Sequence, residues 1–181
     1  MRKRKLLFTA TILSMFLSFT TAYAAVYGGK WTTNPTYYAD SSNIYASQIQ
    51  SAVSTWNSTL SSIGASIRIN TSSITSADII PESSYFGATE WNAMGKPGPD
   101  MYSGSYEYAD LKFNISYMKD YTSTKNKAIA THEWGHILGL NHTADDSISS
   151  LMCWRGSSTY YDQWNLTSPT SYDISQLNTI Y

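Results

Sequence analysis

The residues whose types and spacing could do chemistry lie between positions 132 and 142: His132, Glu133, His136 and His142. In a helix, side chains four residues apart lie on the same face, so His132 and His136 can point at one metal ion. Glu133 is one step around the helix, close enough to reach a water on that ion without displacing it. This spacing predicts two metal ligands and a general base on a single helix.

The third histidine needs a turn in the chain, because a continuous helix would carry His142 away from the other two. Gly139 can provide that turn, since glycine readily adopts the left-handed conformation that ends a helix. Three protein ligands with one open position are typical of catalytic zinc, whereas closed structural sites use four ligands. We therefore expect one Zn²⁺ held by His132, His136 and His142, with Glu133 activating a water on that ion.

Three less specific interpretations stay open. A His-Glu-x-x-His segment occurs by chance in helices that bind nothing, but these three are the only histidines of the protein, and unrelated histidines would not gather in this way. The chain could instead be a catalytically silent, secreted binding module that zinc stabilises, although a purely structural site gains nothing from Glu133. A surface interaction protein is suggested by the Tyr- and Ser-rich composition, yet aromatic side chains usually serve the core.

The helices that must position the site are visible as periodic patterns. Apolar residues recur at three- and four-residue steps in residues 44–60, which predicts a helix. Its expected buried face is Ile49, Ala52, Val53, Trp56 and Leu60, and Gly64 closes it. The motif-bearing helix is expected to begin near the capping residues 122–124 and to run to about Leu138. Residues 168–169 (Ser-Pro) mark the start of a terminal helix, whose apolar residues are Ile174, Leu177 and Ile180.

The strands are predicted by segments in which β-branched and aromatic residues collect between turn residues. These segments are residues 30–38, 65–70, 77–80, 85–91 and 106–117. Residues 94–104 contain two prolines and three glycines and predict a loop, as do residues 143–169, which show no steady period. Helices and strands in this order indicate a small α+β domain.

The N-terminal segment has the three parts of a secretory signal peptide. Residues 2–5 are basic, residues 6–19 are apolar apart from Ser and Thr, and residues 22–24 (Ala-Tyr-Ala) have the small-x-small pattern of a cleavage site. The apolar run is shorter than the roughly 20 residues needed to cross a bilayer, which disfavours an uncleaved anchor. We expect a signal peptide at residues 1–24, one catalytic domain at residues 25–181, and a secreted, extracellular protein.

The charge of the remaining chain limits the kinds of partner it can bind, and its cysteine content limits how the fold is stabilised. Four of the 12 basic residues lie in the signal, so 8 basic and 13 acidic residues remain, a formal net charge of −5. We therefore expect no nucleic-acid partner and no membrane association after signal cleavage. We also expect a monomer. Cys153 is the only cysteine, so no internal disulfide can form and packing must stabilise the fold.

The spacing of the motif resembles a known clan. The pattern from His132 to His142, followed by Met152 in the segment Ser-Leu-Met, is similar to the metzincin clan of zinc peptidases and its Met-turn. This resemblance covers about residues 124–154. Residues 30–31 (Lys-Trp), the long first helix and the terminal helix are similar to the matrixin branch, particularly its small bacterial members.

The resemblance implies a metzincin-like catalytic domain that acts on protein or peptide substrates, with Glu133 activating the water that attacks a peptide bond. A twisted, mixed five-stranded sheet with two helices would lie above the cleft, the Met-turn and the C-terminal helix below it, and the substrate extended between them. Met152 would form an apolar floor beneath the zinc, whereas without the motif it would be an ordinary core methionine. Trp154 stands where some relatives carry a tyrosine near the metal, so the resting site should be three histidines and water. Residues 153–154 (Cys-Trp) depart from the Tyr-Pro usual in matrixins, and no histidine remains for a second, structural zinc.

Further candidates rest on weaker signals. Tyr160 and Tyr161 could donate to the oxyanion or could be packed aromatic residues. Residues 87–92 could pair with the substrate backbone, as the family precedent implies. Cys153 could be a regulatory thiol near the metal or a buried structural one. Calcium is a second candidate ion, without a clear ligand pattern, near Asp78, Asp100 and Asp110.

Overall fold

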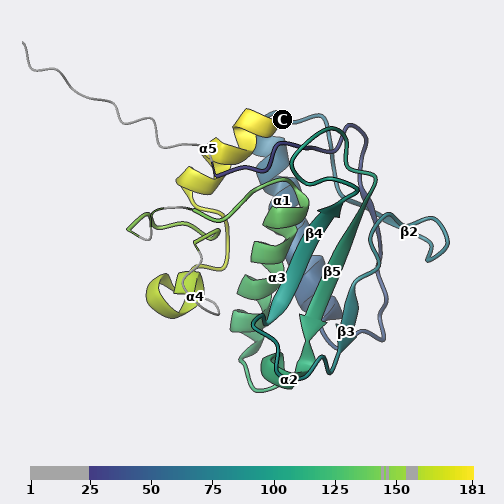
Figure 1. The fold of residues 1–181 in the computed structure, drawn as a ribbon, viewed down its shortest axis with the longest axis vertical. Coiled ribbons are helices and arrows are strands. Elements are labelled where there is room, and N and C mark those ends of the chain that lie inside the picture. The colour runs from purple at the N-terminus through teal and green to yellow at the C-terminus, as the bar shows by residue number, and fades with distance from the viewer. Residues whose placement is uncertain (1–24, 144, 146, 154–158) are drawn as a thin grey trace, which may run out of the picture.

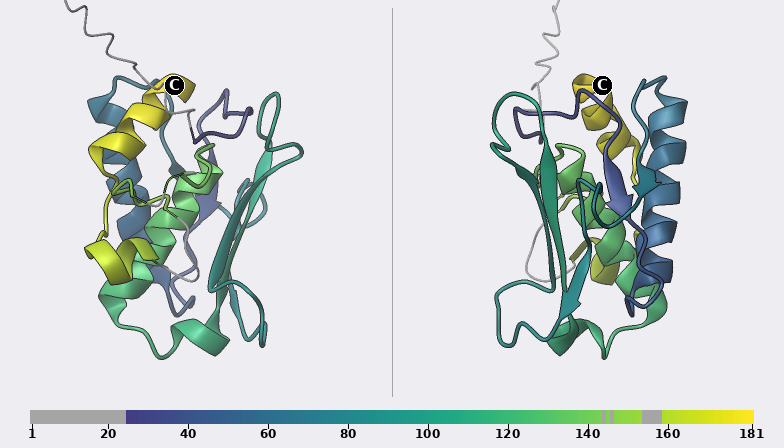
Figure 2. Two further views of the ribbon diagram at one scale, coloured as in Figure 1. Left: turned by 60° about the vertical axis from the view of Figure 1, so that its left-hand side comes forward. Right: turned by 90° about the vertical axis from the view of Figure 1, so that its right-hand side faces the viewer.

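The computed structural model describes residues 25–143, 145, 147–153 and 159–181, which form two layers (Figures 1 and 2). One layer is a sheet of short strands, and the other consists of the long helices α1 (Ala46–Ser62) and α3 (Ser123–Ile137), which cover one face of the sheet. On the other side of α3 lie α4 (Thr159–Trp164) and α5 (Ser171–Ile180). The expected α+β class is confirmed, and α3 lies at the centre of the molecule.

The strands are short and mixed in direction. β1 (Thr36–Tyr38) pairs in parallel with β2 (Asn70–Ser72), and β3 (Glu82–Ser84) pairs in parallel with β5 (Tyr108–Asn114). β4 (Ala93–Gly98) pairs antiparallel with β5. Bridges from Ile79 to Tyr37 and Ala109 join the two groups. The single five-stranded sheet is therefore not confirmed, because the described strands form a two-stranded and a three-stranded sheet.

Helix α1 buries the face that the sequence predicts. Its buried residues include Ile49, Ala52, Val53, Trp56 and Leu60. Trp56 is completely buried, and its indole N–H donates to the Thr131 carbonyl of α3 at 2.7 Å. Gly64 follows the helix with φ +72°, as a closing glycine should. The predicted periodicity is confirmed, and α1 packs along α3.

The helix that carries the motif also follows its sequence signals. Thr122 is the N-cap of α3, and its side chain accepts from the Lys125 N–H. Almost the whole second half of α3 is buried, including the Trp134 side chain, which packs edge-on against Tyr37 of β1. Helix α5 begins with a capping box between Thr170 and Asp173, two residues after the predicted start signal.

The predicted strand at residues 85–91 is wrong, because a buried side chain organises this segment as a loop. Asn114, at the end of β5, accepts from the Phe86 N–H and donates to the carbonyl of Gly87 and the hydroxyl of Thr89. One amide thus satisfies groups that a partner strand would otherwise have to satisfy. Phe86 and Trp91 then pack against each other across the loop, with ring centroids 5.2 Å apart.

The predicted loop at residues 94–104 is also wrong over its first part, where β4 forms in spite of its glycines and proline. The residues of β4 alternate in burial, with Ala93 and Gly95 buried and Lys96 exposed. The buried residues are small because α3 packs closely against them. Small residues give no alternation of large apolar and polar side chains, so the sequence showed no two-residue period. Pro97 is tolerated because β4 is an edge strand.

Other boundaries differ for similar reasons. Strand β2 begins at Asn70 instead of residue 65, because the side chain of Asn57 on α1 exchanges two hydrogen bonds with the backbone of Ile69. In the predicted strand 77–80, Ile79 forms bridges, but β3 starts only after Pro81. Residues 30–38 are extended as a strand only at β1, and α4 interrupts the loop expected at residues 143–169.

The expected signal peptide, residues 1–24, lies outside the described residues. Within the described part of the chain, no helix has the length and apolarity needed to span a bilayer.

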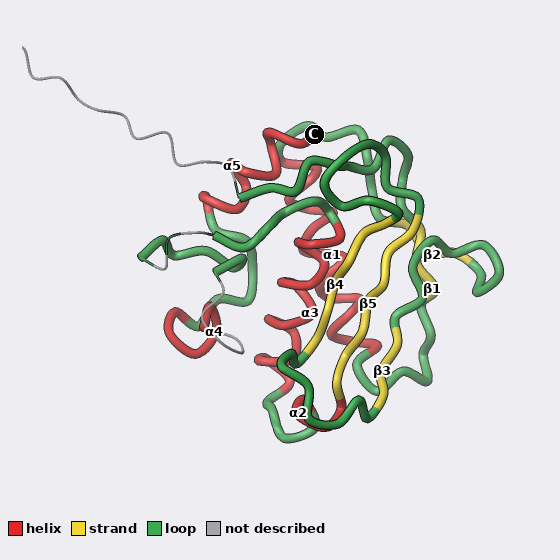
Figure 3. Tube along the Cα trace, in the orientation of Figure 1, coloured by secondary structure: helices red, strands yellow, loops and turns green. Residues whose placement is uncertain are grey.

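The predicted extended segment 106–117 is confirmed over most of its length, since β5 leads into the short helix α2 (Ile115–Met118) near its end (Figure 3).

Candidate metal centre

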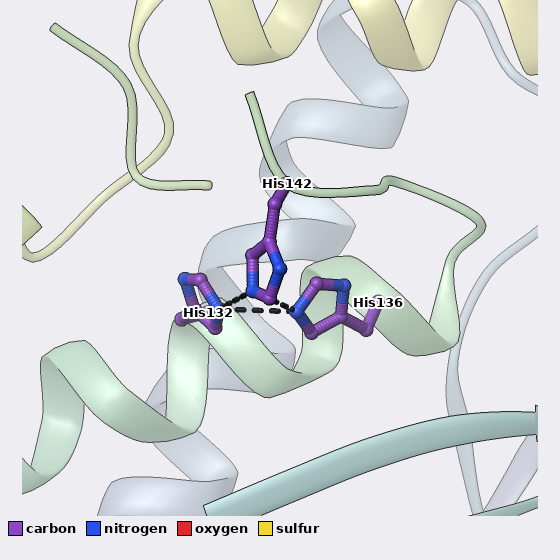
Figure 4. Close-up of side chains that lie close together, drawn as sticks. All are labelled: His132, His136 and His142. Atoms are coloured by element: carbon purple, nitrogen blue, oxygen red, sulfur yellow. Dashed lines mark hydrogen bonds between the residues drawn. The ribbon is translucent and has the colours of Figure 1, made fainter. Parts of the chain in front are cut away.

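The three histidines of the motif converge on one point. His132 and His136 project from the same face of α3, and His142 reaches them from the segment after the helix (Figure 4). Their Nε2 atoms lie 3.1 Å (His132–His136), 3.0 Å (His136–His142) and 3.2 Å (His132–His142) apart. Among the described residues, these side chains form the one group of three or more potential ligands that could hold a metal ion.

The hydrogen bonds of two rings fix which nitrogen faces the centre. His132 Nδ1 lies 2.7 Å from the Leu151 carbonyl, and His136 Nδ1 lies 2.8 Å from the Leu140 carbonyl. A carbonyl oxygen only accepts, so each Nδ1 must carry the proton and donate it. The Nε2 atoms of both rings then present lone pairs to the common point, the arrangement that metal-binding histidines require.

The arrangement fits a zinc ion. Zinc–nitrogen distances of about 2.0–2.1 Å at tetrahedral angles would place the nitrogens about 3.3–3.4 Å apart, close to the observed spacings. Burial lowers the pKa of His136 to about 3 and that of His142 to about 4, and it lowers the pKa of His132 well below its ordinary value. All three rings are therefore neutral at pH 7, the form that binds metal.

The turn after α3 brings His142 back, as the sequence predicts. Gly139 has φ +98°, a left-handed conformation. Chain segments remote in sequence donate to the three backbone carbonyls at the end of the helix. The Trp31 indole N–H donates to the Ile137 carbonyl, the Tyr181 hydroxyl to the Leu138 carbonyl, and the Tyr27 N–H to the Gly139 carbonyl. The last turn of the helix is therefore fixed by residues near both ends of the described chain.

Glu133 lies beside the ligands and is buried, with 7% of its surface exposed. Its Oε2 atom accepts from the Gly95 N–H of β4 at 2.6 Å. Burial raises the pKa of this carboxyl to about 8, while the hydrogen bond from Gly95 acts in the opposite direction. A divalent cation a few ångströms away would favour the carboxylate, so metal binding would prepare this group to accept a proton.

Met152 is buried against α3 in the turn that follows the motif. A Cβ added at Gly135 would lie 2.5 Å from the Met152 sulfur, so the thioether fills the space between the turns that carry His132 and His136. A side chain larger than glycine at position 135 would displace it. This placement agrees with an apolar support for the helix histidines.

A cavity of about 280 Å³ opens at the site. Residues 90–96 line one side of it, and the three histidines, Glu133 and Tyr160 line the other. Tyr160, on α4, stacks its ring on that of His132, with centroids 4.5 Å apart and planes 11° from parallel. Tyr160 is therefore part of the site as a buried, packed aromatic residue, whereas its neighbour Tyr161 does not line the cavity.

Several other candidates from the sequence are not brought into the site. Residues 87–92 do not form the expected strand; residues 90–92 line the cavity as part of a loop, and β4 is the strand that borders it. Cys153 is buried, but it does not join the cluster of potential ligands, and neither do Asp78, Asp100 and Asp110. Trp154 lies outside the described residues.

Sequence reasoning missed three residues that shape the site. Tyr27 lines the cavity, and its hydroxyl lies 3.4 Å from His136 Nδ1, a contact that no local pattern foretells. Gly95 orients Glu133 from a segment that reads as a loop. Asp173 is 1% exposed and accepts hydrogen bonds from the Met-turn. Its place three residues after Thr170 in a capping box is the one signal that could have marked it.

Three convergent histidines, an adjacent glutamate and an open cavity are the features expected of a zinc metallopeptidase site. The family model Peptidase_M43, described as pregnancy-associated plasma protein-A, matches residues 92–179. The matched segment begins just before β4 and includes the three histidines, Met152 and α5 up to its last residue but one. The match supports the metzincin clan of zinc metallopeptidases and does not support the matrixin-like subtype. No curated protein matches the chain.

Proposed function

We propose that the protein is a secreted zinc endopeptidase with protein or peptide substrates. In this proposal His132, His136 and His142 hold the metal and Glu133 is the general base. The observation that carries it is the convergence of three imidazole Nε2 atoms within 3.2 Å of one another beside a buried carboxyl group. Neutral rings in this arrangement favour a cation at their centre.

The chemistry divides between the metal and the chain. A zinc ion held by the three nitrogens would supply a water of lowered pKa and polarise the scissile carbonyl. Glu133 would accept the proton of the attacking water on a carboxylate oxygen and pass it to the leaving amine. The Gly95 N–H, 2.6 Å from Oε2, would keep the carboxylate turned towards the cavity during both transfers.

The substrate is proposed to lie along β4. This strand pairs with β5 on one side and borders the cavity on the other. Backbone groups of a strand alternate in direction, and the N–H of Gly95 points towards Glu133, away from β5. The carbonyls of Ala93 and Gly95 therefore face the cavity side, where an extended peptide could add as a further strand.

Secretion, a monomeric state and the lack of nucleic-acid binding are proposals, and the sequence supports the first and the last of them. The basic, apolar and small-residue parts of residues 2–24 support export with cleavage before Ala25. N-terminal sequencing of the exported protein tests this, and a chain that begins at Met1 would contradict it. A net charge of −5 after cleavage supports a protein that does not bind nucleic acid.

The substitution Glu133→Ala tests the proposed base. The variant should bind zinc like the parent protein, because it keeps all three histidines, but it should lose hydrolysis of casein and of internally quenched peptides. Removal of a general base commonly lowers the rate by about 10²–10⁴-fold. Equal cleavage by the variant and the parent would refute the assigned role.

Metal removal tests the remainder of the proposal. Treatment with a strong chelator should abolish hydrolysis, and added zinc should restore it. A catalytically silent binding module would bind zinc tightly and cleave nothing, so zinc binding without any peptide cleavage would favour that alternative. Full activity in a demonstrably metal-free protein would contradict the mechanism altogether.

A further inference from the structure

Asp173 on α5 is a buried acidic side chain that the proposed reaction does not use. Only 1% of its surface is exposed, and no ion pair to it is found among the described residues. A buried carboxylate is costly unless hydrogen bonds compensate it. Both of its oxygens accept such bonds: Oδ2 from Thr170 and from the Leu151 N–H, and Oδ1 from the Ser150 hydroxyl and, at the longer distance of 3.4 Å, from the Met152 N–H.

The bonds to Oδ1 continue towards the metal centre. Ser150 Oγ donates to Asp173 Oδ1 at 2.5 Å and accepts from the Met152 N–H at 2.9 Å. That N–H belongs to the same peptide group as the Leu151 carbonyl, which accepts from His132 Nδ1 at 2.7 Å. A continuous chain of hydrogen bonds therefore runs from the carboxylate, through one hydroxyl and one peptide group, to a ligand ring.

We propose that Asp173 and Ser150 are positioning residues for the metal centre, acting on His132 through the peptide that joins Leu151 and Met152. Each bond in such a chain polarises the next, so the carboxylate makes the Leu151 carbonyl a stronger acceptor and His132 Nε2 a better donor to a metal. The chain also fixes the rotation of that peptide, and with it the plane of the imidazole. This inference rests on the proposed metal site.

The two sides of Asp173 allow a matched comparison. Ser150→Ala removes the hydroxyl that links the carboxylate to the peptide beside His132, and it leaves the cap of α5 intact. Thr170→Ala removes the hydroxyl's bond to Oδ2 on the helix side, keeps the bond from the backbone N–H, and leaves the chain to His132 in place. Both changes remove one buried or half-buried hydroxyl, so a general loss of packing would affect both variants in a similar way.

The experiment measures zinc affinity by chelator competition and the visible spectrum of the Co²⁺-loaded protein, which reports ligand geometry. Ser150→Ala should weaken zinc binding about 10-fold, at the lower end of the range for groups that orient ligands, and should alter the cobalt spectrum. Thr170→Ala should lower the urea midpoint, because α5 loses its N-cap, but should change zinc affinity less than twofold. Asp173→Asn should weaken zinc binding several-fold, since an amide can still accept from Leu151.

The proposal is overturned if Ser150→Ala and Asp173→Asn bind zinc within twofold of the parent with unchanged cobalt spectra. It is also overturned if Thr170→Ala weakens zinc binding as much as Ser150→Ala does, because the role of Asp173 would then be to support α5. If Asp173→Asn does not fold, the Ser150 and Thr170 variants carry the test. A parent protein that binds no zinc would refute the proposed function itself, which keeps the two failures distinct.

Discussion

Gly139→Ala should separate metal binding from general stability, because this residue makes the turn that returns His142 to the helix. Its φ of +98° is left-handed, and an L-residue there costs roughly 1–2 kcal/mol. An added Cβ would also lie 3.2 Å from the Gly29 carbonyl oxygen and 3.3 Å from the Ile180 side chain, so those neighbours would have to move. Rotation of the chain at this position relieves the strain and carries His142 away from its partners.

The expected effect on zinc follows from the tight spacing of the ligands. The Nε2 atom of His142 lies 3.0 Å from that of His136 and 3.2 Å from that of His132, so a small shift of the backbone opens the set. We expect zinc affinity to fall about 10- to 100-fold, the range found when groups that orient metal ligands are removed. Stability of the metal-free protein should fall by roughly 1–2 kcal/mol.

Gly64→Ala is the matched control, because Gly64 also has a positive φ, +72°, and follows the other long helix. A Cβ there would meet no atom within 4 Å, so only the conformational strain of about 1 kcal/mol should appear. Zinc affinity is measured by chelator competition, and stability by urea unfolding. If Gly139→Ala binds zinc within twofold of the parent while losing as much stability as Gly64→Ala, the left-handed turn does not position His142.

Three further predictions concern the surroundings of the site. Tyr160→Phe should keep zinc affinity and activity, because the ring that stacks on His132 remains. Tyr160→Leu should lower both zinc affinity and activity by about 2- to 10-fold. Loss of activity in the Phe variant would assign the role to the hydroxyl. Trp56→Phe should lower stability by about 1–3 kcal/mol, since the buried Thr131 carbonyl loses its donor, and an unchanged urea midpoint would contradict this. The metal-free protein should lose stability as the pH falls from about 6.5 to about 4, because the unfolded chain protonates three histidines that the fold keeps neutral. Glu133, whose pKa is raised to about 8, contributes the opposite slope for one proton, so three protons outweigh one; urea midpoints that rise on acidification would refute the sign.

The sequence predicted those parts of the fold that local patterns encode. The buried face of α1 was visible as a three- and four-residue repeat, and Thr122 marked the start of α3. Side chains that act over long distances explain most of the errors. The amide of Asn114 orders the loop before β4, and that of Asn57 takes the place of a strand partner for Ile69. Neither role has a local signature, because each amide serves a segment remote in sequence.

The sequence by itself determined that three histidines and Glu133 come together at the glycine turn, because their spacing within eleven residues allows few arrangements on a helix that ends near Gly139. Tertiary structure decided what surrounds them. The edge strand β4 was hidden because its buried residues are small, and the chain from Asp173 to His132 exists only because α5 packs beside the Met-turn. Local geometry could fix the ligand set, whereas burial and hydrogen bonding between distant segments fixed its environment.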